Sequence, residues 1–150
     1  MPNYYGSDTR QHLRLWLKLL KTASGIETMV GNRMKSEFGT TLPRFDVLAA
    51  LDHHPDGLRM SELSRFLMVS NGNITGIANR LVEEKWVARR TDVEDGRVQI
   101  LCLTEIGKQQ FVTMAKRHAT WIDELLAPLG DPEMNQTMIL LDKIQQQLGE

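Results

Sequence analysis

The sequence predicts a mainly α-helical protein with one small β-hairpin, and three observations in residues 57–107 support this fold class. Residues 61–67 and 70–81 carry apolar side chains at helical spacing, which predicts two short helices. After Trp86 apolar and polar residues alternate, as is typical of β-strands, and another helical pattern begins after residue 103. Two helices, a hairpin and a further helix, in this order, form a winged helix-turn-helix domain.

The second of these short helices has one apolar and one polar face. Ser61 and Ser70 are expected to cap the two helices, because a serine hydroxyl accepts hydrogen bonds from the free amides of a first turn. Four apolar residues should pack against the protein: Ile74, Ile77, Ala78 and Leu81. The opposite face holds Asn71, Asn73, Thr75, Gly76, Asn79 and Arg80.

Amide and hydroxyl groups at a helix start suit the major groove of DNA. Asparagine can bond an adenine edge through both its amide oxygen and its amide nitrogen, and threonine can donate or accept. The candidate DNA contacts of this helix are Ser70, Asn71, Asn73, Thr75, Gly76 and Arg80. Arg80 follows the first turns, so a phosphate contact or a bracing role fits it better than base recognition. Alternatively, these polar residues could be exposed to water at the start of the helix without contacting DNA.

The predicted hairpin is the wing, with strands over residues 87–92 and 98–103. Asp95 and Gly96 are expected to supply the positive φ angles of a tight turn. Arg97 lies beside the tip, and Asp95 could pair with it and orient it for a narrow minor groove. The alternative is a surface ion pair of under about 1 kcal/mol. Arg90, like its neighbour Arg89, could equally contact phosphate or lie on a solvated strand.

Long helices are predicted on both sides of the winged-helix segment. The first covers about residues 7–38, is capped by Ser7 or Asp8, and ends at Gly39; a second helix follows with Pro43 in its first turn and ends before Pro55. After the wing, a helix capped by Thr104 runs to about residue 127, and a last helix capped by Asp131 runs to residue 148. We expect one domain, with about 42–104 as the winged helix and about 7–38 and 105–150 as dimerisation helices. These outer helices carry more apolar surface than a small domain can cover, so a second copy should cover the rest.

The wing motif resembles that of the MarR (multiple antibiotic resistance regulator) family. The motif is an Asp-x-Arg followed by Leu-Thr and a glycine, here Asp95, Arg97, Leu103, Thr104 and Gly107. The resemblance covers nearly the whole chain. It implies a homodimeric winged-helix transcription factor, usually a repressor, that binds a pseudo-palindromic operator in double-stranded DNA. It also implies that a small molecule, often aromatic, lowers DNA affinity by binding between the dimerisation helices and the winged helix.

The same resemblance suggests effector-binding residues. Residues 40–77 are similar to members that govern the catabolism of aromatic acids, some of which respond to coenzyme A thioesters. In the family the effector cavity lies where the first helix meets the second, so Trp16 and His12 could stack on an aromatic ligand. Arg44 could meet an anionic group of the effector, and Arg33 could meet the phosphates of an acyl-CoA. The alternatives are a core or dimer position for Trp16 and a salt bridge for Arg44.

The length and composition of the chain limit its possible architecture and function. The chain of 150 residues, 41% apolar, suits one domain. It lacks an apolar signal core and any run near the roughly 18 apolar residues of a membrane span, so we expect a cytoplasmic protein. The net charge of −1 argues weakly against DNA binding. The single Cys102 is interpreted as a packing residue, with a redox role as the alternative.

No catalytic motif or spaced metal-ligand set is present, so we expect neither an enzyme nor a cofactor or metal site. The four histidines are His12, His53, His54 and His118, and adjacent residues such as His53 and His54 point to different helix faces. Two other functions stay open. The chain could be a winged-helix protein-interaction module without DNA binding, or a small enzyme that acts on the effector.

Overall fold

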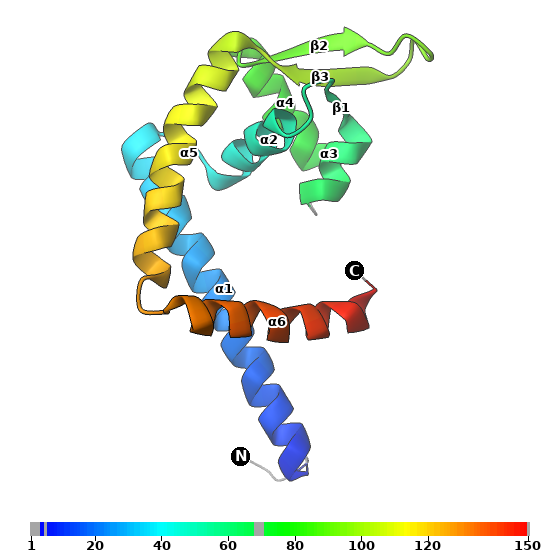
Figure 1. The fold of residues 1–150 in the computed structure, drawn as a ribbon. Coiled ribbons are helices and arrows are strands. Elements are labelled where there is room, and N and C mark those ends of the chain that lie inside the picture. Colours follow the sequence, from blue (N-terminus) through cyan, green and yellow to red (C-terminus); the bar gives the residue numbers. More distant parts are fainter. Residues whose placement is uncertain (1–3, 5, 68–70, 150) are drawn as a thin grey trace. The chain divides into compact units, whose positions relative to one another are not determined.

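The computed structural model describes residue 4 and residues 6–67 and 71–149. The chain divides into two compact units, residues 1–118 and 119–150. The first unit contains α1 (Ser7–Phe38), α2 (Leu42–Asp52), β1 (Leu58–Arg59), α3 (Met60–Leu67), α4 (Asn71–Glu83), β2 (Val87–Thr91) and β3 (Gln99–Leu103). Helix α5 (Glu105–Leu126) begins in the first unit and ends in the second, which also contains α6 (Asp131–Leu148). The predicted class, mainly helical with a small wing, is confirmed (Figure 1).

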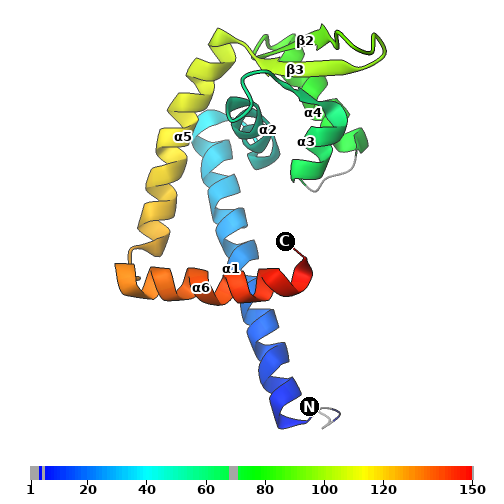
Figure 2. The same ribbon diagram turned by 45° about the vertical axis from the view of Figure 1, so that its right-hand side comes forward.

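The wing belongs to a three-stranded antiparallel sheet of order β1-β3-β2. Strands β2 and β3 pair along their full length, from Val87 opposite Leu103 to Thr91 opposite Gln99. Strand β1 pairs with the other edge of β3, with Leu58 opposite Leu101. Helices α2, α3 and α4 lie on the same side of this sheet (Figures 1 and 2). The sheet therefore holds the β2–β3 hairpin directly beside α3 and α4.

The apolar core of the first unit lies between these helices and the sheet. Its members have at most 5% of their surface exposed, and they include Phe45, Val47, Leu48, Leu51, Leu58, Leu63, Ile74, Ala78, Leu81, Val87 and Leu101. Every element of the winged helix contributes at least one of them. Packing of these side chains fixes α4 and β2 relative to each other.

Strand β1 was not predicted, and it changes the start of the helix pair. Ser61 was expected to cap the first helix, but α3 begins one residue earlier, at Met60, so that prediction is wrong. The carboxylate of Glu62 instead accepts from the backbone N–H of Arg59, at 2.7 Å. The strand extends to Arg59 because Arg59 pairs with Ile100 of β3, next to the buried Leu58. Ser70, the other predicted cap, lies outside the described residues.

The ends of the long helices agree with the predicted bounds, but two predicted caps are wrong. Helix α1 follows Gly6 and α6 follows Gly130, each glycine in an extended conformation, so Ser7, Asp8 and Asp131 lie inside the helices. The carboxylate of Glu133 accepts from the N–H of Gly130, at 2.8 Å. At the end of α1, Gly39 has φ 64° and its N–H donates to the carbonyl of Lys35.

Helices α1 and α6 each expose a set of five or more large apolar side chains. In α1 the exposed set is Leu13, Leu15, Trp16, Leu17 and Leu20. Helix α6 has no buried residue, and Met138, Ile139, Leu140, Leu141, Ile144 and Leu148 are exposed. Among the described residues, no helix combines the length and the apolar character that crossing a membrane requires.

Candidate nucleic-acid interface

Helix α4 has the two faces that its sequence predicts. Ile74, Ala78 and Leu81 are fully or almost fully buried, and Ile77 is half-buried. The opposite face is exposed and presents Asn73, Thr75, Gly76, Asn79 and Arg80. The packed face holds the helix against the core, and the polar face is accessible to another molecule. Asn71 begins the helix, as expected, and Ser70 is not among the described residues.

The wing tip differs from the tight turn that the sequence predicts. The strands end at Thr91 and Gln99, so the connection covers residues 92–98, and Gly96 has no positive φ. Asp92 organises this loop instead. Its backbone N–H donates to the carbonyl of Val98, and its carboxylate accepts from the N–H of Glu94, at 3.0 Å. An aspartate that bonds the backbone two residues on provides a turn without a left-handed residue.

Asp92 also connects the loop to the sheet. Its side chain is 9% exposed and pairs with the guanidinium of Arg59, at 2.7 Å. The hydrogen bond from the Glu94 N–H, supported by the nearby positive charge of Arg59, lowers the pKa of the Asp92 carboxyl below its ordinary value. Asp92 is therefore ionised at neutral pH and holds the base of the loop. The sequence pattern did not reveal this role.

The predicted pair at the tip is present. Asp95 Oδ1 accepts from the backbone N–H of Arg97, at 3.0 Å, and from its Nε, at 3.3 Å. The Arg97 side chain is 93% exposed, so the pair orients the guanidinium without burying it. Val93, on the same loop, is 96% exposed. The wing thus ends in an oriented cation at the surface.

A concavity of ≈ 430 Å³ lies between α4 and the wing. Thr75 and Arg97, two of the predicted DNA contacts, both border it. Its other residues are Arg59, Met60, Ser61, Asn79, Arg89, Val98 and Gln99. Helix α4 and the wing therefore share one surface, as a joint interface requires.

Two adjacent arginines of β2 have different environments. Successive strand residues point to opposite faces, and the guanidinium of Arg89 donates to Asn79 Oδ1 on α4. The guanidinium of Arg90 donates to the backbone carbonyl of Asp56, in the turn before β1, and does not border the concavity. The alternation of a β-strand predicts that these two arginines point to opposite faces of the sheet. Which of the two faces α4 depends on tertiary packing, which no local pattern gives.

The four predicted effector residues do not meet within one chain. Trp16, 55% exposed, and His12 lie on the exposed part of α1. Arg33 follows Trp16 by 17 positions on the same helix, which corresponds to about 25 Å at about 1.5 Å per residue. Arg44 pairs with Glu84 and lies over the ring of Trp86, 5.6 Å from its centroid. The salt-bridge alternative for Arg44 is confirmed.

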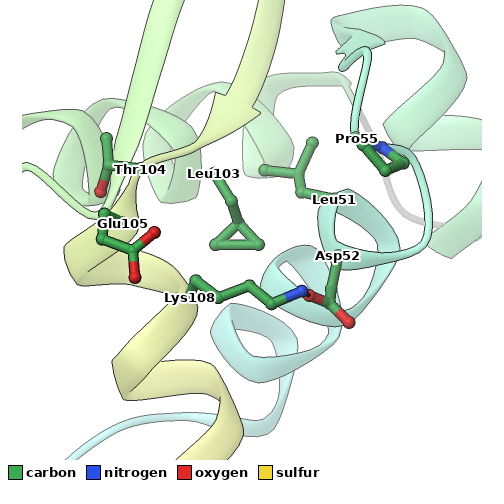
Figure 3. Close-up of a pocket in the computed structure, with 7 residues that line it drawn as sticks. All are labelled: Leu51, Asp52, Pro55, Leu103, Thr104, Glu105 and Lys108. Carbon is green, nitrogen blue, oxygen red and sulfur yellow. Dashed lines mark ion pairs between the residues drawn. The ribbon is translucent and has the colours of Figure 1, made fainter.

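Two cavities border α2. One, of ≈ 330 Å³, lies at the junction of α1 and α2 and is lined by Glu27, Thr28, Gly31, Asn32, Lys35, Thr40, Thr41, Leu42 and Pro43. Thr40 is 6% exposed, and its hydroxyl has no hydrogen-bond partner among the described residues. The other, of ≈ 170 Å³, lies at the base of the wing, where Lys108 of α5 and Asp52 of α2 point toward each other and pair at 2.6 Å (Figure 3). The second is smaller than the roughly 300 Å³ of ordinary ligand sites.

Within the described residues no group of three or more His, Cys, Asp or Glu side chains is arranged to hold a metal ion. Cys102 is half-buried on β3, and its Sγ lies 3.8 Å from the carbonyl oxygen of Asp56. His54 bonds the carbonyl of Ala50 through Nδ1, at 2.8 Å, while His53 is exposed.

Comparison with known proteins identifies the family of the chain. A sequence model of the MarR family matches residues 38–98. The chain is 30% identical over 108 residues to the transcriptional repressor MdtR of Bacillus subtilis, an alignment that covers 72% of this chain and 69% of MdtR. It is 28% identical over 134 residues to the transcriptional activatory protein BadR of Rhodopseudomonas palustris, covering 87% of this chain and 76% of BadR.

Solved structures share the fold over nearly the whole chain. A MarR family regulator from Silicibacter pomeroyi is 28% identical, with a TM-score of 0.80 over 96% of this chain and 99% of that one. PcaV from Streptomyces coelicolor, solved with its natural ligand, is 26% identical, with a TM-score of 0.70 over 95% of this chain and 97% of that one. Sco3205 from the same organism, solved with DNA, is 19% identical and shares the fold, with a TM-score of 0.80 over 97% of this chain and 90% of that one. The chain therefore belongs to the MarR family, whose members are winged-helix transcription regulators and not enzymes.

Proposed function

We propose that this protein is a cytoplasmic, homodimeric regulator that binds double-stranded DNA and responds to a small aromatic effector. The observation that carries the DNA-binding part is the shared surface of α4 and the wing. An exposed polar helix face and the oriented Arg97 border the same concavity. Such a surface allows a helix to enter the major groove of DNA while a cation on the wing enters the adjacent minor groove.

The proposed contacts follow the two parts of this surface. Asn73, Thr75 and Gly76 face the base edges, and Arg80 contacts phosphate. Asn71, the first residue of α4, and Ser70, which precedes it in the sequence, complete the proposed base-contacting set. Arg97 enters the minor groove, oriented by Asp95.

A homodimer is supported by the exposed apolar side chains of the outer helices. Leu17 of α1 is 58% exposed and Leu148 of α6 is 70% exposed, and both belong to larger apolar sets. A second copy could cover these residues and would place two recognition helices about a two-fold axis, so the operator would be a pseudo-palindrome. Deletion of residues 128–150 should leave an aggregated or unfolded chain in analytical ultracentrifugation. A soluble monomer that still binds DNA would contradict the dimer.

The effector proposal combines the junction of α1 and α2 with the partner's helices. The cavity at this junction, ≈ 330 Å³, falls within the range of small-molecule sites, and the Thr40 hydroxyl can bond a ligand. Trp16, with His12 one turn earlier, would stack on an aromatic ring once a second copy covers α1. Arg33 is the proposed contact for the phosphates of an aromatic acyl-CoA. Arg44 would meet an anionic effector only by exchanging its Glu84 partner.

We propose repression as the sign of regulation, released by the effector. MdtR is named a repressor and BadR an activatory protein, so the relatives include both signs. The test is a DNA shift assay against the neighbouring promoter, repeated with a panel of aromatic acids and their coenzyme A thioesters. The effector should weaken DNA binding, and DNA should weaken effector binding by the same factor, because the two share one equilibrium. Calorimetric titration in both orders checks this factor, and independent binding would contradict the coupling.

The alternative is a protein-interaction module that uses the same surface without DNA. Salt-dependent binding of the pure protein to duplex DNA would exclude it, because counterion release is specific to a polyanion.

Trp16→Ala should reduce the effector response and spare DNA affinity.

A further inference from the structure

A glycine separates two opposite charges on one face of α1. Glu27, Gly31 and Lys35 follow each other at intervals of four residues, so they share one face of the helix. The two charged residues are eight positions apart, which corresponds to about 12 Å at about 1.5 Å per residue. In the described part of the chain, neither Glu27 nor Lys35 forms an ion pair. Both charges are therefore available to a ligand.

The space over Gly31 is open and belongs to the cavity of ≈ 330 Å³ at the junction of α1 and α2. A Cβ added to Gly31 would meet no side chain and no neighbouring element within 4 Å. All three residues of this helix face line the cavity, together with Leu42 and Pro43 of α2. The cavity therefore has an acidic end, a basic end and an apolar wall.

Two further residues indicate what this cavity lacks. Thr40, 6% exposed, lines the cavity, and its hydroxyl has no hydrogen-bond partner in residues 6–67 and 71–149. Asp46 lies in the second turn of α2. Burial, and then the negative charge of Glu27, raise the pKa of the Asp46 carboxyl above its ordinary value. The carboxyl groups of the two helices are thus close enough to repel each other, and a cation between them would relieve this repulsion.

These features together favour a ligand that carries both charges. An ammonium group would meet the two carboxyl groups, and a carboxylate would pair with Lys35. The Thr40 hydroxyl can donate to a ligand oxygen or accept from a ligand N–H. An apolar body beside the two charges would pack on Leu42 and Pro43. A simple anion would leave the acidic end without a cation, and a simple cation would leave Lys35 without an anion.

We propose that the cavity at the junction of α1 and α2 binds a small zwitterion, with its ammonium group at Glu27 and Asp46 and its carboxylate at Lys35. An amino acid with an apolar side chain is the simplest molecule of this class. The inference rests on the proposed effector response and names the chemical class of the effector. Gly31 makes room for the ligand, and Thr40 supplies a neutral hydrogen bond.

Two matched sets of probes test the ligand class with the full chain. One set is phenylalanine, phenylpropionate and phenylethylamine; the other is leucine, isocaproate and isoamylamine. By calorimetry, the amino acid of at least one set should bind about tenfold or more tightly than both analogues of that set, as expected for a charge-assisted hydrogen bond. If the amino acid exceeds both of its analogues in neither set, the inference is overturned.

The decisive variant is Gly31→Leu. Leucine is a good helix former, and its side chain enters open space, so the fold is retained while the cavity is filled. Binding of the amino acid should be lost. Gly25→Leu is the matched control, because a Cβ there also meets no side chain within 4 Å and Gly25 does not line the cavity. Thermal unfolding of both variants checks the fold, and wild-type affinity in Gly31→Leu would show that the amino acid binds elsewhere.

Two charge variants test the orientation of the ligand. Glu27→Gln should weaken the binding of the amino acid about tenfold and leave the binding of its acid analogue unchanged. Lys35→Gln should weaken the amino acid to a similar extent and leave the amine analogue unchanged. Equal losses for the acid and the amine in each variant would contradict the proposed orientation.

DNA shift assays with the same probes separate this inference from the proposed function. If an amino acid binds the wild type and not Gly31→Leu, but leaves DNA affinity unchanged, the zwitterion site is supported and the proposed effector response fails. If an aromatic acid without an ammonium group releases DNA and no amino acid binds, the effector response is supported and the zwitterion site is wrong.

Discussion

The hydroxyl of Thr104 lies 2.6 Å from the carbonyl oxygen of Lys85, to which it donates a hydrogen bond. The same hydroxyl oxygen accepts from the backbone N–H of Gly107, at 3.0 Å, and so caps α5 as the sequence predicts. Lys85 is the residue at which the chain turns from α4 into β2. The Thr104 side chain therefore connects the turn between α4 and β2 to the first turn of α5.

Replacing this hydroxyl should loosen that junction. Thr104→Val keeps the size of the side chain but leaves the Lys85 carbonyl and the Gly107 N–H without this partner. Unfolding free energy should fall by about 1 to 3 kcal/mol. Urea unfolding measures the change, and Thr104→Ser, which keeps the hydroxyl, is the control. Equal stability of the valine and serine variants would show that the hydrogen bonds contribute nothing.

Lys85 itself has φ 64°, a left-handed conformation that favours glycine. Lys85→Gly removes a local cost of about 1 to 2 kcal/mol and adds a smaller entropy cost in the unfolded chain, so a net gain of about 0.5 to 1 kcal/mol is expected. The Thr104 contact uses the backbone carbonyl of Lys85 and is retained. The control is Glu83→Gly in α4, which should instead lose about 1 kcal/mol. A loss of stability in Lys85→Gly, measured by thermal unfolding, would contradict the interpretation.

Gly107 packs against the backbone of Trp86. A Cβ at this position would overlap the Trp86 carbonyl and approach Leu103 to 3.0 Å, and backbone atoms cannot move aside cheaply. Gly107→Ala should therefore destabilise the fold by about 1 to 3 kcal/mol and separate α5 from the wing. Gly25→Ala is the control, because a Cβ there meets no atom within 4 Å in this chain. An alanine at 107 with wild-type unfolding temperature would disprove the close contact.

The helices and the wing could be predicted because their signals are local. The apolar spacing of Ile74, Ala78 and Leu81 gave the buried face of α4, and alternation after Trp86 gave β2. The Asp95 and Arg97 pair was also predicted, since its two members are neighbours in sequence. These features need no knowledge of distant contacts.

The errors involve contacts between distant parts of the chain. Strand β1 is a strand only because Leu58 and Arg59 pair with β3, about forty residues later, and two residues have no periodicity to detect. The wing loop follows Asp92, which pairs with Arg59, so Gly96 is not required to take a positive φ. Asn79 and Arg89 likewise meet across the α4 to β2 junction. No spacing rule could reveal that contact.

Stability should decrease as the pH falls below neutrality, and His118 is one cause. His118 on α5 stacks on Phe45 of α2, with ring centroids 4.8 Å apart. Burial disfavours the charged imidazolium and lowers the pKa of His118 from its ordinary value of 6.5. Between pH 6.5 and the lower pKa of the folded state, the unfolded chain therefore binds more protons than the folded chain. The contribution of neutral His118 to folding stability is complete above pH 6.5 and is lost as the pH falls toward the folded-state pKa.

Urea midpoints measured at about pH 7.5 and about pH 5.5 give the size of this effect. His118→Phe keeps a ring against Phe45 and has no proton to gain, so its midpoint should depend less on pH. His53→Phe, at an exposed position, is the control and should keep the wild-type dependence. If His118→Phe and wild type lose stability equally, His118 is not a source of the acid sensitivity.

The recognition helix and the wing should contribute differently to DNA binding. Asn73→Ala removes a proposed base-edge contact, so it should cost about 1 to 3 kcal/mol on the preferred duplex and relax the preference at one base pair. Arg97→Ala removes a cation that is 93% exposed, is oriented by Asp95 and is the proposed minor-groove contact. It should weaken binding to many sequences of similar groove width and make the salt dependence shallower.

Asp95→Ala should resemble Arg97→Ala in part, because the guanidinium keeps its charge but loses its orientation. Titration of wild type and the three variants at fixed salt, against a selected duplex and a scrambled one, separates these effects. The Asn73 variant should change the ratio of the two affinities, whereas the Arg97 variant should lower both. An Arg97→Ala protein with wild-type affinity and salt slope would show that the wing does not contact DNA.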